Sequence, residues 1–477
     1  MKLAERMASL PPPRSIPGAR RALKDALLRS ATRLVAIDDD PTGTQTVHGV
    51  RVLMEWAVPA LARALRRPEP LFYVSTNSRS LSPSDATALA RRVGAGLREA
   101  AAQAHVRILV ASRSDSTLRG HFPSEVDALA AELPARPDGV LLVPAFFDAG
   151  RYTIDNVHWV DTGDGLVPAH ETEFARDPDF GFANSDLREW VQEKTRGRVK
   201  ASEVACIGIE DIRQGGPGKV AEILDRARGG VPIVANAACD ADLEVIALGA
   251  GAAEEQGKTF LYRTSASFVK VRAGVEDRPL LARSEMSPRA GHGLVVVGSY
   301  VARTSGQVEH LIRSGRAVPI EISVPRLLSE QDRPAEVLRA IRAASGALGG
   351  GATAIVYTSR QKHDSADFLA AGRGIMEALC EVVRGIEQPP GFIVAKGGIT
   401  AMAIARNALG CSEAFVLGQV LKGVPVWRLG PGSRWSDVPY VVFPGNVGGP
   451  TALLDVVNAM AGTGDREGPG MEARSYG

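Results

Sequence analysis

Short runs of Val, Ile and Leu alternate along this chain with stretches rich in Ala, Leu, Arg and Glu. Runs such as LVAI at Leu34, LFYVST at Leu71 and VRILVAS at Val106 have the length and composition of buried strands. The stretch 83–104 repeats its apolar residues every three or four positions, which is typical of a helix. Because parallel strands need a crossover connection, this alternation predicts βα units around a mostly parallel sheet, an α/β fold.

The chain has 477 residues, too many for one ordinary core, so we expect two domains, each with a mostly parallel sheet flanked by helices. Pro and Gly break the periodicity in EDRPLLARSEMSPRAGHG, which places the boundary near residues 275–292. The predicted organisation is a flexible Pro-rich lead-in over 1–30, one domain over 31–280, a second over 290–462, and a disordered tail over 463–477.

One part of the first domain departs from the alternating pattern. After Gly150, the stretch RYTIDNVHWVDTGDGLVPAHETEFARDPDFGFANSDL is polar and carries no long apolar run. We interpret it as a long, loop-like excursion. Long ordered loops in compact domains usually serve a binding or catalytic site.

Composition excludes several classes of function. The formal net charge is +2, and the acids and bases are interspersed, so the basic stripe that a nucleic-acid binder needs is missing. The four cysteines, at 206, 239, 380 and 411, fall in no metal-binding or disulfide spacing and are interpreted as reduced thiols. The N-terminus has no secretory h-region, and no window approaches twenty apolar residues. We therefore expect a cytoplasmic protein with small-molecule partners, bound to neither nucleic acid nor membrane.

The first motif with chemical content is IDDDPTGTQTVHG, which directly follows a predicted strand. Asp39 and Asp40 would project from the carboxyl end of that strand, where ligand crevices form in open α/β sheets. Thr42 and Gly43 form a turn whose N–H groups can hold a polar ligand. A carboxylate there can accept a proton from a substrate hydroxyl or help to hold a metal that accompanies a nucleotide. The alternative is a polar loop whose acids face water.

The second motif, SRSDSTLRGHFPSEVDAL, also follows a predicted strand. Arg119 offers a planar fork that suits a carboxylate, while Asp115, Ser116 and Thr117 offer hydrogen-bonding groups for hydroxyls. This combination fits a sugar acid. Alternatively, Asp115 and Arg119 form an ion pair that braces a turn.

Three further strand ends indicate anion binding in the second half. Ser299 follows the strand LVVVG; Gly397, Gly398 and Thr400 follow FIVAK; and Gly445 and Asn446 follow VVFP. Glycines let a phosphate approach backbone N–H groups, and a following helix directs its positive end toward that phosphate. The motif KGGIT matches neither common phosphate-loop signature, so a plain tight turn is the alternative. For the other two loops the alternatives are an ordinary connector and a terminal domain cap.

Taken in order, the motifs DDPTGTQT, SDSTLRGHF, VPAFFDAGRYT, GSYVARTSGQ, KGGIT and FPGNVGG resemble those of the four-carbon acid sugar kinase family. The resemblance extends from about Arg33 to Ala461. It implies a sugar-acid-binding N-terminal domain, a nucleotide-binding C-terminal domain, and ATP-dependent phosphorylation of small acids such as threonate, erythronate or 3-oxo-tetronate.

The same resemblance implies roles for individual residues. Asp39, Asp115 and Arg119 fall in the substrate-side motifs; the positions that match ATP contacts are Ser299, Gly397, Gly398, Ile399, Thr400 and Gly445. We expect Mg²⁺ to accompany ATP in an in-line transfer, Arg119 to fix the substrate carboxylate, and Asp39 or Asp115 to accept the hydroxyl proton. A homodimer is expected.

Three departures from the commoner family pattern bear on the substrate and on phosphate binding. Thr46 stands where many relatives have Asp, Ile399 where Glu is frequent, and Ala401 where Ser is frequent. Two other functions stay open from the sequence: a nucleotide-independent hydrolase or isomerase of sugar acids, and a non-enzymatic sensor that binds such an acid.

Overall fold

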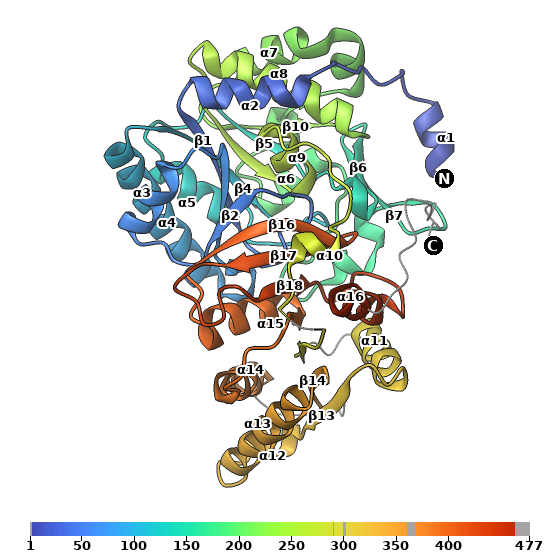
Figure 1. Cartoon of the computed structure of the whole chain (residues 1–477). Coiled ribbons are helices and arrows are strands. Elements are labelled where there is room, and N and C mark those ends of the chain that lie inside the picture. Colours follow the sequence, from blue (N-terminus) through green and yellow to red (C-terminus); the bar gives the residue numbers. More distant parts are fainter. Residues whose placement is uncertain (1, 290, 299–301, 360–367, 463–477) are drawn as a thin grey trace. The chain divides into compact units, whose positions relative to one another are not determined.

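The computed structural model describes residues 2–289, 291–298, 302–359 and 368–462 (Figure 1). The chain forms two compact units, which we describe separately. The first contains the residues up to Gly43 together with Glu55–Asp277; the second contains Thr44–Met54 and the residues from Arg278 onward. The expected tail over 463–477 lies outside the described residues.

The first unit is built on a parallel sheet in the order β3-β1-β4-β11-β5-β10-β9. Its central strands are buried along most of their length, which explains their near-continuous Val, Ile and Leu runs. Their bounds are β1 (Thr32–Asp38), β3 (Leu71–Ser75), β4 (Arg107–Arg113), β5 (Gly139–Val143), β9 (Ala205–Ile207), β10 (Val231–Ala235) and β11 (Phe260–Thr264).

Helices of the first unit pack in two groups. In one group α3 (Val58–Leu65) and α5 (Ser124–Glu132) contact α4 (Pro83–Ala104); in the other, α8 (Asp240–Glu255) contacts α2 (Ala19–Arg29), α7 (Gly216–Asp225) and α9 (Ala266–Arg272). Helix α4 has the bounds that the sequence periodicity predicted, with Ser82 as its N-cap. The α/β class predicted from the sequence is confirmed for this unit.

The N-terminal segment corrects one expectation. Instead of a flexible lead-in over 1–30, the structure has α1 (Leu3–Ala8) and α2 (Ala19–Arg29). Leu23 and Leu27 of α2 are buried, because apolar residues spaced by four lie on one helix face. Arg20 fastens the same helix, since its guanidinium donates to Glu244, to Asp240 and to the carbonyl of Val275.

The stretch after Gly150 is also more regular than expected. It contains a small antiparallel sheet of β6 (Arg151–Ile154), β7 (Val157–Asp161) and β8 (Leu166–Pro168). Asp155 and Asn156 join β6 to β7 with φ of 54° and 66°, the left-handed conformation that a two-residue hairpin turn needs. The dipeptide Asp-Asn between two alternating segments was the available sequence signal. Helix α6 (Leu187–Lys194) follows.

The second unit has a mixed sheet in the order β13-β14-β12-β15-β18-β17-β16-β2. Pairs from β13 to β18 are parallel, and the pairs from β18 to β2 are antiparallel. The strand bounds are β12 (Leu294–Val297), β13 (Val318–Ile322), β14 (Ala354–Thr358), β15 (Ile393–Lys396), β16 (Glu413–Leu421), β17 (Val424–Leu429) and β18 (Pro439–Phe443).

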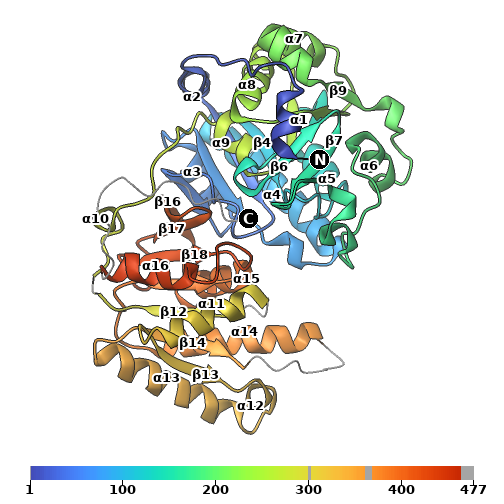
Figure 2. The ribbon, with the colours of Figure 1, turned by 90° about the vertical axis from the view of Figure 1, so that its right-hand side faces the viewer.

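Helices flank this sheet, and Figure 2 shows α12 and α13 beside β13 and β14. Their bounds are α10 (Arg283–Met286), α11 (Ala302–Arg313), α12 (Val324–Leu328), α13 (Arg333–Gly349), α14 (Phe368–Gly385), α15 (Gly398–Ala403) and α16 (Ala452–Ala461). Buried side chains such as Val295, Phe392 and Phe443 join the sheet to α16 in one core. This unit too is α/β.

Strand β2 (Val50–Leu53) belongs to the second unit although it lies between elements of the first. It pairs with β16, and Arg51 forms an ion pair of 2.7 Å with Glu413. Trp427 donates from Nε1 to the hydroxyl of Thr44 at 3.1 Å. The chain therefore leaves the first unit after Gly43, returns after Met54 and leaves again after Asp277.

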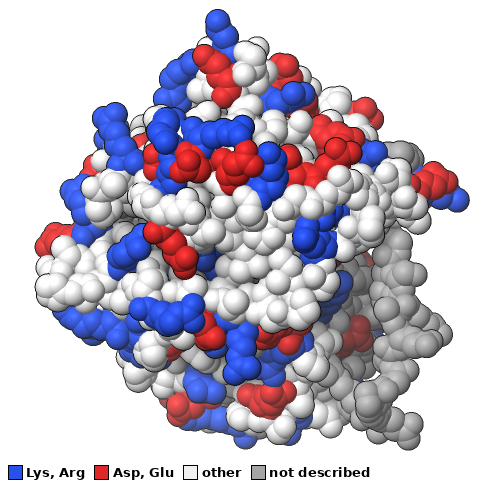
Figure 3. All heavy atoms as spheres, turned by 90° about the horizontal axis from the view of Figure 1, so that it is seen from above, with Lys and Arg blue, Asp and Glu red and all other residues white. Residues whose placement is uncertain are grey.

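Charged side chains are interspersed on the face seen in Figure 3, where Lys and Arg lie among Asp and Glu. This distribution agrees with the net charge of +2. Within the described ranges, no helix combines the length and the apolar character that a bilayer span requires.

Candidate active site

The two acidic motifs of the first unit meet at the carboxyl edge of its sheet. Asp38, the last residue of β1, lies opposite Ser75 of β3 and Arg113 of β4 in the strand register. The loops that follow these three neighbouring strands therefore gather at one edge, as the sequence analysis expected for the loops after β1 and β4.

Asp38 is buried and pairs with Arg113, with 3.2 Å between Oδ1 and Nη1. Burial raises the pKa of Asp38 to about 7, and the Arg113 charge opposes this rise. The turn residue Gly43 packs on the carboxylate: a Cβ at this position would lie 1.7 Å from Asp38 Oδ2. A glycine is thus required here for close approach.

Asp39 pairs with a different cation, Arg79. Arg79 holds it with two bonds, Nη2 to Oδ1 at 2.5 Å and Nε to Oδ2 at 3.3 Å, and the Ser114 hydroxyl donates to Oδ2. The backbone N–H of Arg79 also donates to the Asp39 carbonyl. Asp39 is consequently held in one orientation by groups from β3 and β4 loops.

Asp40 accepts hydrogen bonds from the backbone N–H and the hydroxyl of Thr42, and Arg79 Nη1 lies 3.2 Å from its Oδ2. Burial alone would raise the pKa of Asp40, but Arg79 and Thr42 outweigh it and the pKa is lowered. The three crowded acids are therefore compensated by two arginines, Arg113 for Asp38 and Arg79 for both Asp39 and Asp40, instead of all facing water.

Arg79 is one of the residues that the sequence analysis missed. It lies in η1 (Ser78–Ser80) after β3, and it reaches Asp39, Asp40 and, at 3.9 Å, Asp115. The available signal was an Arg in the polar segment STNSRS at a strand end.

Asp115 and Arg119 form the ion pair that the sequence left open, with Nε 2.8 Å from Oδ2. The Thr117 hydroxyl donates to the same carboxylate. Burial would raise the pKa of Asp115, but Arg79, Arg119 and Thr117 together lower it far below its ordinary value. Asp115 is thus a carboxylate held in its ionised form.

The small sheet β6-β7-β8 is joined to this loop through His158. Its Nε2 lies 2.7 Å from the Ser116 carbonyl, and its Nδ1 lies 3.0 Å from the Thr153 hydroxyl. Burial lowers the pKa of His158 to about 4. Through this contact the stretch after Gly150 adjoins the Asp115 loop, and its service to a binding or catalytic site stays a prediction.

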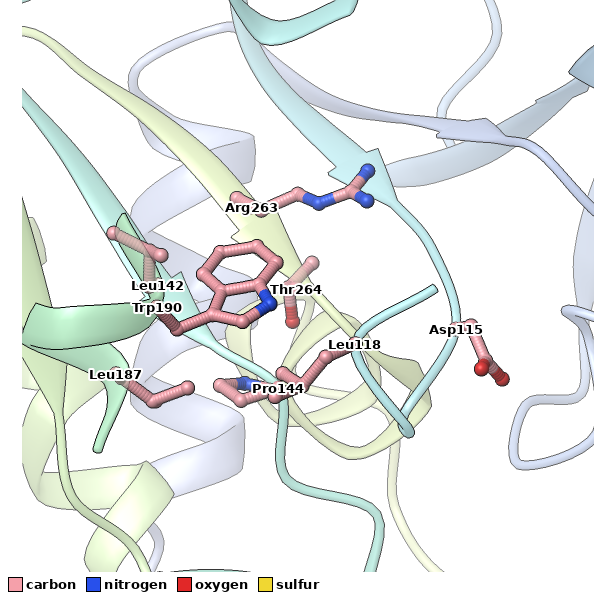
Figure 4. Close-up of a pocket in the computed structure, with 8 residues that line it drawn as sticks. All are labelled: Asp115, Leu118, Leu142, Pro144, Leu187, Trp190, Arg263 and Thr264. Atoms are coloured by element: carbon pink, nitrogen blue, oxygen red, sulfur yellow. The ribbon is translucent and has the colours of Figure 1, made fainter. Parts of the chain in front are cut away.

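A small cavity of about 20 Å³ lies behind the loop and has room for about one water molecule. Figure 4 shows Trp190, Leu118 and Pro144 around it, with the Asp115 carboxylate directed away from Trp190. Arg263 also lines this cavity and donates to the Ser112 hydroxyl at 3.1 Å.

In the second unit, the predicted anion loops follow neighbouring parallel strands. The order β12-β15-β18 places Gly298, Gly397 and Gly445 at one edge of the sheet. Gly397 has φ of 106°, which favours glycine, and its N–H donates to the Phe443 carbonyl at 2.7 Å. Ser299 lies outside the described residues.

The glycine loop runs directly into α15. Thr400 is buried, and a Cβ added to Gly298 would lie 2.6 Å from its Oγ1, so the loops after β12 and β15 are in contact. Gly398 opens the helix, whereas the Ile399 side chain is 56% exposed. Asn446 is exposed, and its carbonyl accepts a hydrogen bond from Arg303.

Lys396 connects the loops after β15 and β18. Its Nζ donates to the Pro444 carbonyl at 2.7 Å, lies 3.4 Å from the Gly445 carbonyl and 3.8 Å from the centre of the Phe443 ring. Burial, with a contribution from Arg303, lowers the pKa of Lys396 to about 7. The amine thus fastens the Gly445 loop to the glycine loop.

Comparison with known proteins identifies the class. A family model described as a sugar-binding N-terminal domain matches residues 34–272, and one described as a nucleotide-binding C-terminal domain matches residues 294–453. These two regions contain the two polar sheet edges described above and define a protein with a sugar-binding part and a nucleotide-binding part. The chain belongs to the four-carbon acid sugar kinase family.

Named relatives cover nearly the whole chain. It is 28% identical over 444 residues to a 3-oxo-tetronate kinase of Methylobacterium radiotolerans, with 90% of this chain and 99% of the relative covered. It is 27% identical over 453 residues to a D-threonate kinase of Salmonella typhimurium, with 89% and 97% covered. A D-erythronate kinase of Heliobacterium modesticaldum is 26% identical over 462 residues, with 90% and 97% covered.

Solved structures agree with the fold. A Salmonella typhimurium protein described as a putative tRNA synthase aligns with a TM-score of 0.65 at 17% identity, covering 89% of this chain and 98% of its own. A Haemophilus influenzae protein from a domain family of unknown function aligns with a TM-score of 0.62 at 17% identity, covering 89% and 100%. At these identities the likeness establishes the fold alone.

Proposed function

We propose that this protein is an ATP-dependent kinase that phosphorylates a hydroxyl of a small sugar acid of about four carbons, such as a tetronate or 3-oxo-tetronate. The observation that carries the proposal is the arrangement of polar loops in a chain of this family. Each unit gathers them at the carboxyl edge of its own parallel strands, acids and arginines in one unit and glycines in the other.

On the sugar-acid side, we assign the substrate hydroxyls to Asp39, Asp40 and the Asp115 loop. Their arginine partners keep these groups oriented, which suits a reaction in which positioning supplies most of the rate. Asp39 or Asp115 accepts the hydroxyl proton as transfer proceeds. The low pKa of Asp115 makes it a weak base, which the loose transition state of phosphoryl transfer tolerates.

Four further residues complete this proposed side: Thr42, Gly43, Ser116 and Thr117. Thr42 and Thr117 act by orienting carboxylates, since their hydroxyls donate to Asp40 and Asp115. Gly43 acts by leaving room for the Asp38 carboxylate. Ser116 acts through its carbonyl, which holds His158.

On the nucleotide side, we assign the phosphates to the N–H groups of Gly397, Gly398, Ile399 and Thr400, with Gly445 and Asn446 closing over the nucleotide. Ser299 is the proposed contact from the loop after β12. The left-handed Gly397 and the side-chain-free Gly398 give phosphate oxygens access to the backbone.

Mg²⁺ is proposed to accompany ATP. Across the described stretches of chain, no group of three or more His, Cys, Asp and Glu could hold a metal. A nucleotide-borne Mg²⁺ needs few protein ligands because phosphates and water supply most of its oxygens, and the Thr400 hydroxyl beside Gly298 is a suitable one. When bound, the ion neutralises charge on the phosphate oxygens.

A coupled ADP-release assay over four- and five-carbon sugar acids and their 3-oxo derivatives tests the proposal. We expect one acid to stimulate ATP consumption at least a hundredfold over the background without acid, with a phosphorylated acid as product. Acid turnover without nucleotide would instead identify a hydrolase or isomerase. Thermal stabilisation by an acid with no ATP consumption anywhere in the panel would identify a sensor.

We propose that the reaction takes place in the cytoplasm, as expected from the sequence. The homodimer expected from the sequence stays a prediction, which light scattering of the purified protein tests.

A further inference from the structure

We infer that Arg151 is the main residue that binds the carboxylate of the sugar acid, and that Arg119 contributes less to this binding. This inference rests on the proposed function for its substrate class. It is carried by a contrast between two arginines on one aromatic ring: the guanidinium of Arg119 is already matched by carboxylates, whereas that of Arg151 is not.

Both arginines lie over Phe174, a residue of η4 (Glu173–Arg176). The guanidinium carbon of Arg119 is 5.1 Å from the ring centre, and that of Arg151 is 5.5 Å from it. An aromatic face attracts a guanidinium and fixes its plane, leaving the N–H groups at the edge free to donate. The ring therefore presents two cations at one place.

The charge of the Arg119 guanidinium is already compensated by protein carboxylates. Its Nε donates to Asp115 at 2.8 Å and lies 3.2 Å from the Thr117 hydroxyl, and its Nη1 lies 3.5 Å from Asp177. Two carboxylates thus face a single guanidinium. An anionic ligand would have to compete with both of them.

Arg151 presents the opposite situation. Throughout the described ranges its guanidinium forms no hydrogen bond or ion pair with protein, and its Nε is buried without a partner. Burial lowers the pKa of Arg151; the charges that act on it are Asp115, Glu173 and Asp161, which raise the pKa, and Arg119, which lowers it. A half-buried cation that has no partner gains the most binding free energy when a carboxylate binds to it.

The backbone around Arg151 is held firmly. Arg151 exchanges two hydrogen bonds with Phe146, at 3.0 and 3.1 Å, and begins β6. The contact of His158 with Ser116 joins the same small sheet to the Asp115 loop. Arg151 is therefore placed beside the proposed hydroxyl-binding groups by the fold and not by its own side-chain bonds.

The other arginines near these loops differ from Arg151 in their partners or their burial. Arg79 holds Asp39 and Asp40, and Arg113 holds Asp38, although the Nε of Arg113 also has no partner. Arg263 donates one hydrogen bond, to the Ser112 hydroxyl, and like Arg113 it is buried. Arg151 is only half-buried and its guanidinium has no hydrogen bond within the described residues, so its fork is open to a carboxylate that accepts two parallel hydrogen bonds.

Arg151→Met tests the inference, with Arg151→Lys, Arg119→Met and Arg107→Met alongside. Arg107 is an exposed arginine at the start of β4, opposite the site edge, and its variant controls for loss of a charge. Each protein is assayed with the best acid and with the matching polyol, in which CH₂OH replaces the carboxylate. Titration calorimetry measures acid and ATP-analogue binding.

For Arg151→Met we expect kcat/KM for the acid to fall about 100-fold, mainly through KM, while the polyol and the ATP analogue are unaffected. Arg151→Lys should retain part of the acid preference because it keeps the charge without the fork. Arg119→Met should lose less than Arg151→Met, and Arg107→Met should match wild type.

Two results overturn the inference: an Arg151→Met protein that binds the acid as tightly as wild type, or one that loses acid and polyol equally. Failure of the proposed function looks different, since wild-type protein would bind an acid without phosphorylating it. The binding comparison would then still decide the role of Arg151. Wild-type protein that binds no acid of the panel overturns both.

Discussion

Gly43→Ala examines the packing beneath the first acidic motif with a single methyl group. The new Cβ would lie 1.7 Å from Oδ2, 2.2 Å from Cγ and 2.3 Å from Oδ1 of Asp38. These distances are about half an ordinary contact, so the carboxylate must leave its place. It would then leave Arg113, whose side chain is 5% exposed, as a buried cation without its partner.

Above the Asp38 pKa of about 7, where this carboxylate is charged, breaking the buried ion pair by removing one partner costs about 3–5 kcal/mol. Replacing glycine by alanine also restricts the unfolded chain, which offsets about 0.4–1 kcal/mol. We therefore expect Gly43→Ala to lower the free energy of unfolding of the first unit by roughly 3 kcal/mol. KM for the sugar acid should rise as well, because Asp39 and Asp40 continue from the displaced residue.

Urea unfolding followed by circular dichroism measures the loss, and hydrogen exchange of β1 and β4 peptides assigns it to the first unit. Gly218→Ala is the matched control: Gly218 is an exposed residue of α7 with nothing within 4 Å of the added methyl, so this variant should be as stable as wild type or slightly more stable. A Gly43→Ala protein that loses less than about 1 kcal/mol would refute the reasoning from close packing.

Three other variants address the nucleotide loops and the buried acid. Gly397→Val should weaken binding of an ATP analogue at least tenfold and leave acid binding unchanged, because φ of 106° strains any side chain that would also obstruct phosphate; equal losses of both ligands in calorimetry would contradict this. Lys396→Met should raise KM for ATP about tenfold or more, since the loop after β18 loses the amine that donates to its Pro444 carbonyl; an unchanged KM for ATP would show that this loop keeps its conformation without the amine. Asp38 has a pKa raised by burial from 3.8 to about 7, so its proton stabilises the fold fully below about pH 4, and that contribution is lost as pH rises through 7. Asp38→Asn should flatten the dependence of the free energy of unfolding on pH between pH 4 and 7. If denaturant titrations give the variant the same pH dependence as wild type, the raised pKa of Asp38 is contradicted.

The sequence was sufficient for the features that depend on local pattern. Buried strands such as LVAI and the periodic stretch 83–104 predicted an α/β chain, and the structure places β1 and α4 there. Local signals also placed polar motifs at strand ends, because a parallel strand returns its polar loop to the same sheet edge each time. Where local signals were weak, as in α2 and in the hairpin around Asp155 and Asn156, the expectation of irregular structure was wrong.

The partners of those motifs were decided by the tertiary structure. Nothing in IDDDPTG states that Arg113 would pair with Asp38 or that Arg79 would pair with Asp39. Arg113 ends the neighbouring strand β4 and Arg79 follows the neighbouring strand β3, so both come from segments well separated along the chain. The same holds for β2, whose partner β16 lies more than 350 residues later. Residue types and spacings determine which groups are available for chemistry, whereas charge compensation depends on which loops the sheet order brings together. For this reason the availability of Arg151 and the engagement of Arg119 could be recognised only in the folded chain.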